Sequence, residues 1–153
     1  CMGNICRSPT AHGVFQKMVD DAGLGEQIFV ESSGTAAWHL GKAPDSRSAA
    51  TALKRGYDLS PLVARKAVAE DFDEYDYILA MDSSNLHDLQ QLAPAHHKAK
   101  LSLFLEYASQ QTYSEVPDPY YGNGDGFELV LDLVEDAARG LLAQIRQADL
   151  SAR

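Results

Sequence analysis

The sequence predicts an α/β fold in three layers, with helices on both faces of a parallel sheet. Short apolar runs that suit buried strands alternate along the chain with longer segments that carry apolar residues at helical spacing. Strands separated by helices favour parallel pairing, because each helix carries the chain back across one face of the sheet. The 153 residues are enough for an ordinary core, and we predict a single domain over residues 1–153.

The first predicted helix covers residues 8–22. Ser8 followed by Pro9 is typical of an N-cap and the first helical position. Gly23 and Gly25 are expected to end this helix. The apolar positions at helical spacing are Ala11, Val14, Phe15, Met18 and Ala22.

One short strand and a second helix are predicted next. Residues 28–31 are interpreted as the strand, and a loop then runs through Trp38 to Pro44. Asp45 is a typical helix cap, and the helix after it is expected to reach about Arg55 and to close at Gly56.

Two further strands and two helices are predicted in the second half. Residues 75–81 form an apolar run that suits a buried parallel strand, and residues 82–85 are typical of the cap of a helix that reaches about Leu92. Residues 99–104 are interpreted as another strand. The last helix, residues 127–145, carries a continuous apolar stripe along one face.

Residues 1–9, C-M-G-N-I-C-R-S-P, form the motif on which the functional prediction depends. Five residues separate Cys1 from Arg7. A loop of this length can turn its backbone N–H groups toward one centre, and the N-terminus of the following helix adds positive potential there. Gly3 and Asn4 tolerate the positive φ that such a turn requires. We therefore expect this loop to hold an anion the size of phosphate.

Cys1 and Arg7 are the residues predicted to carry the chemistry of this loop. A guanidinium can bind two oxygens of one phosphoryl group through parallel N–H donors. The same donors can lower the pKa of a neighbouring thiol from ~8.5 to ~3.5–7.5, which makes the thiolate available as a nucleophile at neutral pH. Cys1 is the predicted nucleophile, in line with the leaving group, and Arg7 the predicted phosphate-binding side chain.

This loop sequence resembles the phosphate loop of the low-molecular-weight protein tyrosine phosphatases. The bare C-x5-R spacing is a weak signal, whereas the longer string G-N-I-C-R-S-P is specific. The resemblance covers essentially the whole chain and implies a phosphatase I-like fold. It also implies hydrolysis of phosphotyrosine in proteins through a phosphocysteine intermediate, without a metal or another cofactor.

The same resemblance implies a four-stranded parallel sheet whose first strand would precede Cys1. In the family, a hydrophobic strand runs directly into the nucleophilic cysteine and lies centrally in the sheet. A loop at the carboxyl end of a strand needs that strand. We therefore expect the working protein to carry several residues before Cys1.

Asp118 is the candidate general acid. A tyrosine oxygen that leaves from phosphorus needs a proton, and the second step of the reaction needs a base to activate water. Pro117 and Pro119 stiffen the loop around Asp118, and a neighbouring phosphate dianion favours the protonated carboxyl. The segment V-P-D-P-Y-Y-G matches the catalytic-acid loop of the family. An ordinary proline turn is the other interpretation of this segment.

Three aromatic residues, Trp38, Tyr120 and Tyr121, are expected to wall the substrate pocket. A deep slot with aromatic walls accepts a phenyl ring, and phosphoserine is too short to reach the phosphate loop through it. In the family the position of Trp38 borders the pocket. From the sequence alone, Trp38 could also be a packing or partner-binding residue.

The other loop residues are expected to bind phosphate or to support the loop. Asn4 and Ser8 would hold its strained backbone. Cys6 could form a disulfide with Cys1 under oxidation, which in resembling enzymes protects the nucleophile. A buried, small apolar residue is the other interpretation of Cys6. The full set is Met2, Gly3, Asn4, Ile5, Cys6 and Ser8.

Two residues depart from the family pattern around this loop. The family usually has a histidine in the segment S-x-H-x-A-R, where it braces the asparagine of the loop, and this chain has Leu62 at that position. His12 stands where a glutamate is common. These differences concern the support of the loop and leave the nucleophile and the acid in place.

Charge and composition exclude several kinds of partner. The net charge of −9 and the pI near 4.8 argue against binding to nucleic acid or to anionic membranes. Phosphate binding must therefore come from the loop amides and Arg7, because exposed charges beyond roughly 8–10 Å are screened at physiological salt. Two cysteines make no disulfide framework, and the sequence has no secretory or membrane-spanning run, so a cytoplasmic protein is predicted. The spacing of the histidines suggests no metal site.

Three alternative functions share this fold or loop. Thiol-dependent arsenate reductases use further cysteines, and no cysteine follows Cys6. Arginine phosphatases typically have threonine in place of Ile5. The larger side chain of Ile5 favours a tyrosine phosphatase. A phosphotyrosine-binding module is expected to lack the nucleophile or the acid. The predicted partners are phosphotyrosine-containing proteins, with a tyrosine kinase as one candidate, and inorganic phosphate is the product.

Overall fold

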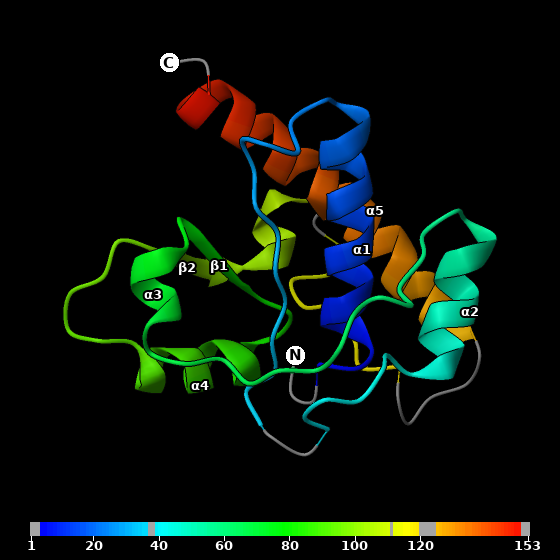
Figure 1. Cartoon of the computed structure of the whole chain (residues 1–153), viewed down its shortest axis with the longest axis horizontal. Coiled ribbons are helices and arrows are strands. Elements are labelled where there is room, and N and C mark those ends of the chain that lie inside the picture. Colours follow the sequence, from blue (N-terminus) through cyan, green and yellow to red (C-terminus); the bar gives the residue numbers. More distant parts are fainter. Residues whose placement is uncertain (1–3, 37–38, 111, 120–124, 151–153) are drawn as a thin grey trace.

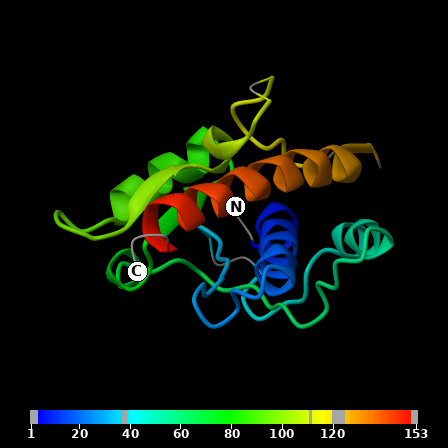
Figure 2. The same ribbon diagram turned by 90° about the horizontal axis from the view of Figure 1, so that it is seen from above.

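Helices surround a short parallel sheet in this computed structural model (Figure 1), which describes residues 4–36, 39–110, 112–119 and 125–150. The long helices α1 and α5 pack against one face of the sheet, and the shorter α3 and α4 pack against the other. In the view of Figure 2, α5 runs between α1 and α4. In chain order the elements are α1 (Arg7–Asp21), α2 (Ser46–Lys54), α3 (Asp71–Glu74), β1 (Tyr77–Ala80), α4 (Ser83–Leu92), β2 (Lys100–Leu103), η1 (Phe104–Tyr107), α5 (Asp125–Ile145) and the π-helix η2 (Arg146–Leu150).

The two strands pair in parallel, with Tyr77 opposite Lys100 and Ala80 opposite Leu103. Successive side chains of β1 point to opposite faces, as a strand requires. Ile78 and Ala80 belong to the cluster formed with α3 and α4, whereas Tyr77 and Leu79 pack against the larger core formed with α1 and α5. The prediction of an α/β fold with a parallel sheet between helical layers is therefore confirmed.

The strand predicted at residues 28–31 is wrong, because this segment is irregular in the structure. A strand is stable only where a neighbouring strand takes its backbone hydrogen bonds. Two cavities, of about 150 and 400 Å³, are lined jointly by this segment and by β1, and no ladder joins the two. Within the described ranges the sheet has two strands, with a separate bridge between Gly34 and Lys66. The four-stranded sheet is thus not confirmed, and its first strand stays a prediction.

Helix α1 begins at Arg7 rather than at Pro9, and its N-cap is Cys6, so the prediction of Ser8 as N-cap is wrong. Pro9 is tolerated in the first turn, because the N–H groups there have no acceptor within the helix. The Ser8 hydroxyl is used for tertiary contacts instead. The end of the helix agrees with the prediction, since Gly23 follows the C-cap with a φ of 73°.

The caps of α2 and α4 agree with the prediction. The Asp45 carboxylate accepts hydrogen bonds from the N–H groups of Arg47 and Ser48 at the start of α2. The Asp82 carboxylate accepts one from Asn85 at the start of α4. Each acidic side chain satisfies backbone donors that the helix itself cannot pair.

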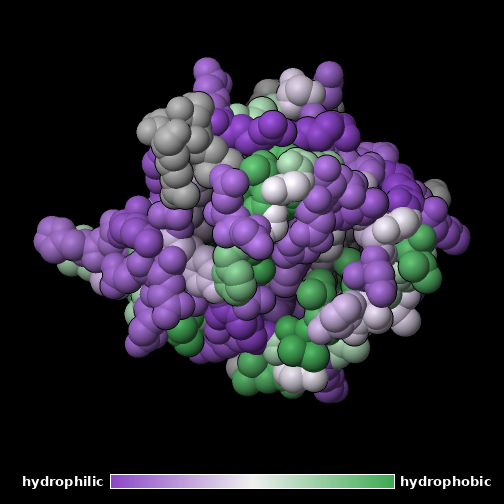
Figure 3. All heavy atoms as spheres, turned by 45° about the horizontal axis from the view of Figure 1, so that its top comes forward, coloured by the Kyte–Doolittle hydropathy of each residue, from purple (hydrophilic) through white to green (hydrophobic). Residues whose placement is uncertain are grey.

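Hydrophilic residues cover most of the face shown in Figure 3, and hydrophobic residues form separate patches on it. Among the described helices, none combines the length and the apolar character needed to cross a membrane.

Candidate active site

The loop at the start of α1 is the centre of the candidate site. The structure describes six of the predicted site residues, namely Asn4, Ile5, Cys6, Arg7, Ser8 and Asp118. The others lie outside the described residues, and their roles stay predictions: Cys1, Met2, Gly3, Trp38, Tyr120 and Tyr121.

Asn4 has a φ of 58°, in the left-handed region that asparagine tolerates better than most residues. The residue is 2% exposed, and its side chain joins the start of α1 to two other segments. The amide nitrogen donates to Ser8 Oγ at 2.7 Å and to Ser32 Oγ at 3.3 Å, and the amide oxygen accepts from the Arg65 N–H at 3.0 Å. These bonds hold the loop in a strained conformation that it would not keep alone.

Arg7 is the buried cation of the site, with 3% of its surface exposed. Its Nη1 donates to Asp82 Oδ2 at 2.6 Å and to the carbonyl of Val116 at 2.9 Å. Its Nη2 lies 3.8 Å from Asp118 Oδ2. The guanidinium therefore has one nitrogen fixed by the protein scaffold and a second directed to the predicted general acid.

Asp82 is a site residue for which the sequence predicted only the role of a helix cap. One of its oxygens accepts from the N–H of Asn85 at 2.7 Å, and the other binds Arg7. Burial alone would raise the pKa of Asp82, but the Asn85 N–H and the Arg7 guanidinium outweigh it and hold the pKa below its ordinary value. A signal was present, because Asp82 follows a predicted strand and functional side chains gather at the carboxyl ends of parallel strands.

The acid loop is attached to the end of β1 by backbone bonds. The Val116 N–H donates to the Met81 carbonyl at 2.8 Å, and the Val116 carbonyl accepts from Arg7. Ser83 N–H also donates to Glu115 Oε1 at 3.1 Å. Asp118 comes two residues after Val116, and 40% of its side chain is exposed. This anchoring brings Asp118 next to Arg7 although the two residues lie 111 positions apart in the chain.

Cys6 is a free thiol with 4% of its surface exposed. Burial raises the pKa of Cys6 to about 11; Asp45 and Asp118 act in the same direction, and a hydrogen bond with Ser48 opposes them. Cys6 is therefore a neutral thiol at pH 7 and is not itself an activated nucleophile. The disulfide with Cys1 stays a prediction.

Leu62 and His12, the two residues that depart from the family pattern, both lie within the described residues. Leu62 is partly buried and packs against the larger core, so it makes no polar contact with Asn4. The backbone N–H of Arg65, three residues later, binds Asn4 instead. His12, on α1, lies with its Nδ1 2.9 Å from Ser32 Oγ. Ser32 in turn accepts from Asn4, so His12 is joined to the loop through one hydroxyl.

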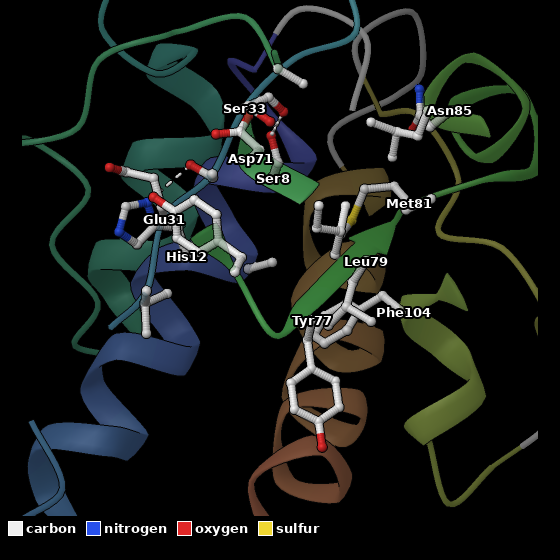
Figure 4. Close-up of a pocket in the computed structure, with 18 of the residues that line it drawn as sticks. Ser8, His12, Glu31, Ser33, Asp71, Tyr77, Leu79, Met81, Asn85 and Phe104 are labelled. Carbon is white, nitrogen blue, oxygen red and sulfur yellow. Dashed lines mark hydrogen bonds between the residues drawn. The ribbon is translucent and has the colours of Figure 1, made fainter. Parts of the chain in front are cut away.

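The cavity of about 150 Å³ drawn in Figure 4 lies beside this polar network. Ser8, His12, Glu31, Ser33 and Asp71 form its polar end, and Tyr77, Leu79, Met81 and Phe104 form its apolar end. It lies behind the loop and does not include Arg7 or Asp118. Among the residues that the structure describes, no cluster of three or more His, Cys, Asp or Glu side chains could hold a metal ion.

Comparison with known proteins gives a consistent result over the whole chain. Residues 1–150 match the family model described as low molecular weight phosphotyrosine protein phosphatase. The chain is 48% identical over 128 residues to the low molecular weight phosphotyrosine protein phosphatase of Schizosaccharomyces pombe, covering 83% of this chain and 81% of the relative. It is 43% identical to the low molecular weight protein-tyrosine-phosphatase of Streptomyces coelicolor, covering 96% and 91%.

A solved structure shares the fold. The crystal structure of a protein tyrosine phosphatase from Entamoeba histolytica, with Hepes in its active site, superposes with a TM-score of 0.92. The two proteins are 37% identical, and the superposition covers 96% of this chain and 94% of that one.

Proposed function

This chain belongs to the low molecular weight phosphotyrosine protein phosphatase family, and on that premise we propose that it hydrolyses phosphotyrosine in proteins through a phosphocysteine intermediate on Cys1. The observation that carries the proposal is the contact between Arg7 and Asp118. Asp82 holds the buried guanidinium in place, and the second nitrogen of the guanidinium lies near Asp118. This arrangement suits a site that binds a phosphoryl group and protonates its leaving oxygen.

The reaction has two steps. The Cys1 thiolate attacks phosphorus and forms an S–P bond as the P–O bond to tyrosine breaks, and Asp118 gives its proton to the leaving oxygen. Water then attacks the phosphocysteine, Asp118 accepts a proton from it, and the S–P bond breaks. The second step releases inorganic phosphate and restores the thiolate. Arg7 and the loop amides stabilise the charge on the phosphoryl oxygens in both steps.

Supporting residues follow from the contacts around Arg7. Asp82 keeps the guanidinium oriented, since a buried cation without a partner would be costly. Asn4 and Ser8 hold the loop that carries the amide donors. Trp38, Tyr120 and Tyr121 would wall the pocket for the tyrosine ring. We further propose that the substrates are cytoplasmic phosphotyrosine proteins, with a tyrosine kinase as one candidate.

The nucleophile is tested with p-nitrophenyl phosphate at mildly acidic pH in excess chelator. Wild-type protein should turn over, and Cys1→Ser should lose about 10³-fold or more of kcat, because a hydroxyl at this site is protonated. Rapid quenching and mass spectrometry should find one added phosphoryl group on wild type and on the control Cys6→Ser. An adduct that persists in Cys1→Ser would contradict the assignment.

The acid and the substrate are tested by changing the leaving group. Asp118→Asn should lower kcat by about 10²–10³-fold on a phosphotyrosine peptide and by less on p-nitrophenyl phosphate, whose leaving group needs little protonation. A phosphoarginine peptide serves as the competing substrate. Higher kcat/KM on phosphoarginine than on phosphotyrosine would overturn the proposed specificity and leave the cysteine mechanism intact.

A further inference from the structure

We propose that His12 is a positioning residue, which holds the phosphate loop in its active conformation through Ser32 and Asn4. This inference rests on the proposed phosphatase function, because it concerns the same loop. His12 lies one helical turn beyond the loop on α1, and Ser32 comes from a different segment. The three side chains form a continuous chain of hydrogen bonds from His12 Nδ1 through Ser32 Oγ to Asn4 Nδ2.

The direction of these bonds follows from the donors and acceptors available. A serine hydroxyl has one hydrogen and two lone pairs. Asn4 Nδ2 can only donate, so it occupies a lone pair of Ser32 Oγ. The Ser32 hydrogen is then available for His12 Nδ1, which accepts it when the imidazole is neutral and carries its proton on Nε2. In this arrangement Ser32 is held in the rotamer that receives the Asn4 amide.

The surroundings of His12 favour that neutral form. Glu31, Arg65, Asp71 and Tyr75 line the same cavity, and Figure 4 shows Glu31 and Asp71 there with His12. Burial lowers the pKa of His12 below its ordinary value; Arg65 acts in the same direction and Glu31 opposes them. At neutral pH the imidazole can therefore accept from Ser32. Protonation would turn Nδ1 into a donor, so the Ser32 hydrogen would have to turn away from His12 to another acceptor, which changes the orientation of the hydroxyl that receives the Asn4 amide.

Asn4 is the point at which this chain of bonds affects chemistry. It has the positive φ of the loop, and its side chain is fixed at Ser8, Ser32 and the Arg65 N–H. Loosening the Ser32 contact leaves a buried amide hydrogen poorly paired, which allows the loop to sample other conformations. The loop amides would then be aligned less often for the phosphoryl oxygens.

The test uses two substitutions at His12 that differ in one acceptor. His12→Asn places an amide oxygen near the position of Nδ1 and keeps an acceptor for Ser32, whereas His12→Leu removes it. His12→Leu should lower kcat/KM on p-nitrophenyl phosphate about three- to tenfold and raise the inhibition constant of inorganic phosphate in parallel, and His12→Asn should restore most of both. His87→Leu, an exposed histidine on α4, is the control and should match wild type.

Ser32→Ala supplies the coupling test. If His12 acts through Ser32, the effect of His12→Leu should disappear in the Ser32→Ala background. Wild type should also lose activity at acid pH as the His12 imidazole is protonated, and the pH profile of His12→Asn should lack this loss. Equal losses for His12→Leu and His12→Asn, or additive losses with Ser32→Ala, would overturn the proposal.

A readout without turnover separates this inference from the proposed function. The side-chain amide signals of Asn4 in ¹⁵N NMR spectra should shift on acidification in wild type and should not do so in His12→Asn. An inactive wild type with this titration would contradict the proposed function and support the role of His12. An active wild type whose Asn4 signals do not titrate would support the proposed function and contradict the role of His12.

Discussion

Arg7 shows how one residue is constrained by segments far apart in the chain. The residue is 3% exposed, and its Nη1 binds Asp82 and the Val116 carbonyl while its Nη2 lies near Asp118. A lysine ammonium could not keep this planar arrangement, because its donors lie on one freely rotating nitrogen. The residue type is thus set by geometry as well as by charge.

The raised pKa of Cys6 leads to a prediction on oxidation. Peroxide should oxidise Cys1 to the sulfenic acid first, and the Cys6 thiolate should then attack its sulfur and displace hydroxide to form the disulfide. Because the pKa of Cys6 is about 11, its thiolate fraction and the rate of the second step should rise about tenfold per unit between pH 7 and 9. Stopped oxidation followed by intact-mass analysis measures this rate.

Cys6→Ser is the matched variant for that experiment. It should accumulate sulfinic acid on Cys1 and recover poorly with dithiothreitol, whereas wild type should recover. A disulfide rate independent of pH, or equal recovery of both proteins, would show that Cys6 does not resolve the oxidised cysteine.

At the scale of elements, α5 is held against its neighbours by close packing and by charge. Gly140 lies where α5 meets η1, and a Cβ there would come within 1.8 Å of the Tyr107 carbonyl oxygen. Arg55, at the end of α2, binds Glu128, Asp132 and Glu135 on α5. These contacts fix the register of α5 against both α2 and η1.

Gly140→Ala should destabilise the protein, although alanine favours helices by about 1 kcal/mol over glycine. The methyl group meets backbone that cannot move aside, so we expect the free energy of unfolding to fall by about 2 kcal/mol or more. Gly13→Ala is the comparison, because its Cβ would meet a side-chain atom, Leu59 Cδ2 at 2.3 Å, and not backbone. Urea denaturation compares the two. A smaller loss for Gly140→Ala than for Gly13→Ala would contradict this account of the α5 contact.

At the scale of the whole molecule, the net charge of −9 opposes the approach of a phosphorylated substrate. The positive groups that bind phosphate act at short range, whereas the overall negative potential acts over a Debye length. Binding affinity and rate of encounter are therefore governed by different parts of the protein.

Raising NaCl from about 0.01 M to 0.15 M should lower KM for an acidic phosphotyrosine peptide about two- to fivefold, with little change in kcat, because screening reduces the repulsion. A peptide of the same length with lysines around the phosphotyrosine should respond in the opposite direction. Steady-state kinetics on both peptides measures the effect. The same salt response for both would show that the net charge has no part in encounter.

Local sequence by itself determined the elements that depend on nearby residues. Asp45 and Asp82 cap α2 and α4 as predicted, Gly23 ends α1, and the alternation of strands and helices gave the α/β class. The loop motif identified the candidate site for the same reason, since its residues are consecutive. Helix caps and phosphate loops are local structures, and their residue preferences are correspondingly strong.

Only the tertiary structure decided which distant residues meet. Asp82 lies 75 positions from Arg7, and Ser32 and Arg65 reach Asn4 from two further segments, so no spacing in the chain revealed these contacts. The same limit explains the wrong strand at residues 28–31. Apolar residues can favour extended backbone, but a strand forms only where another strand pairs with it, and that partner is a property of the fold.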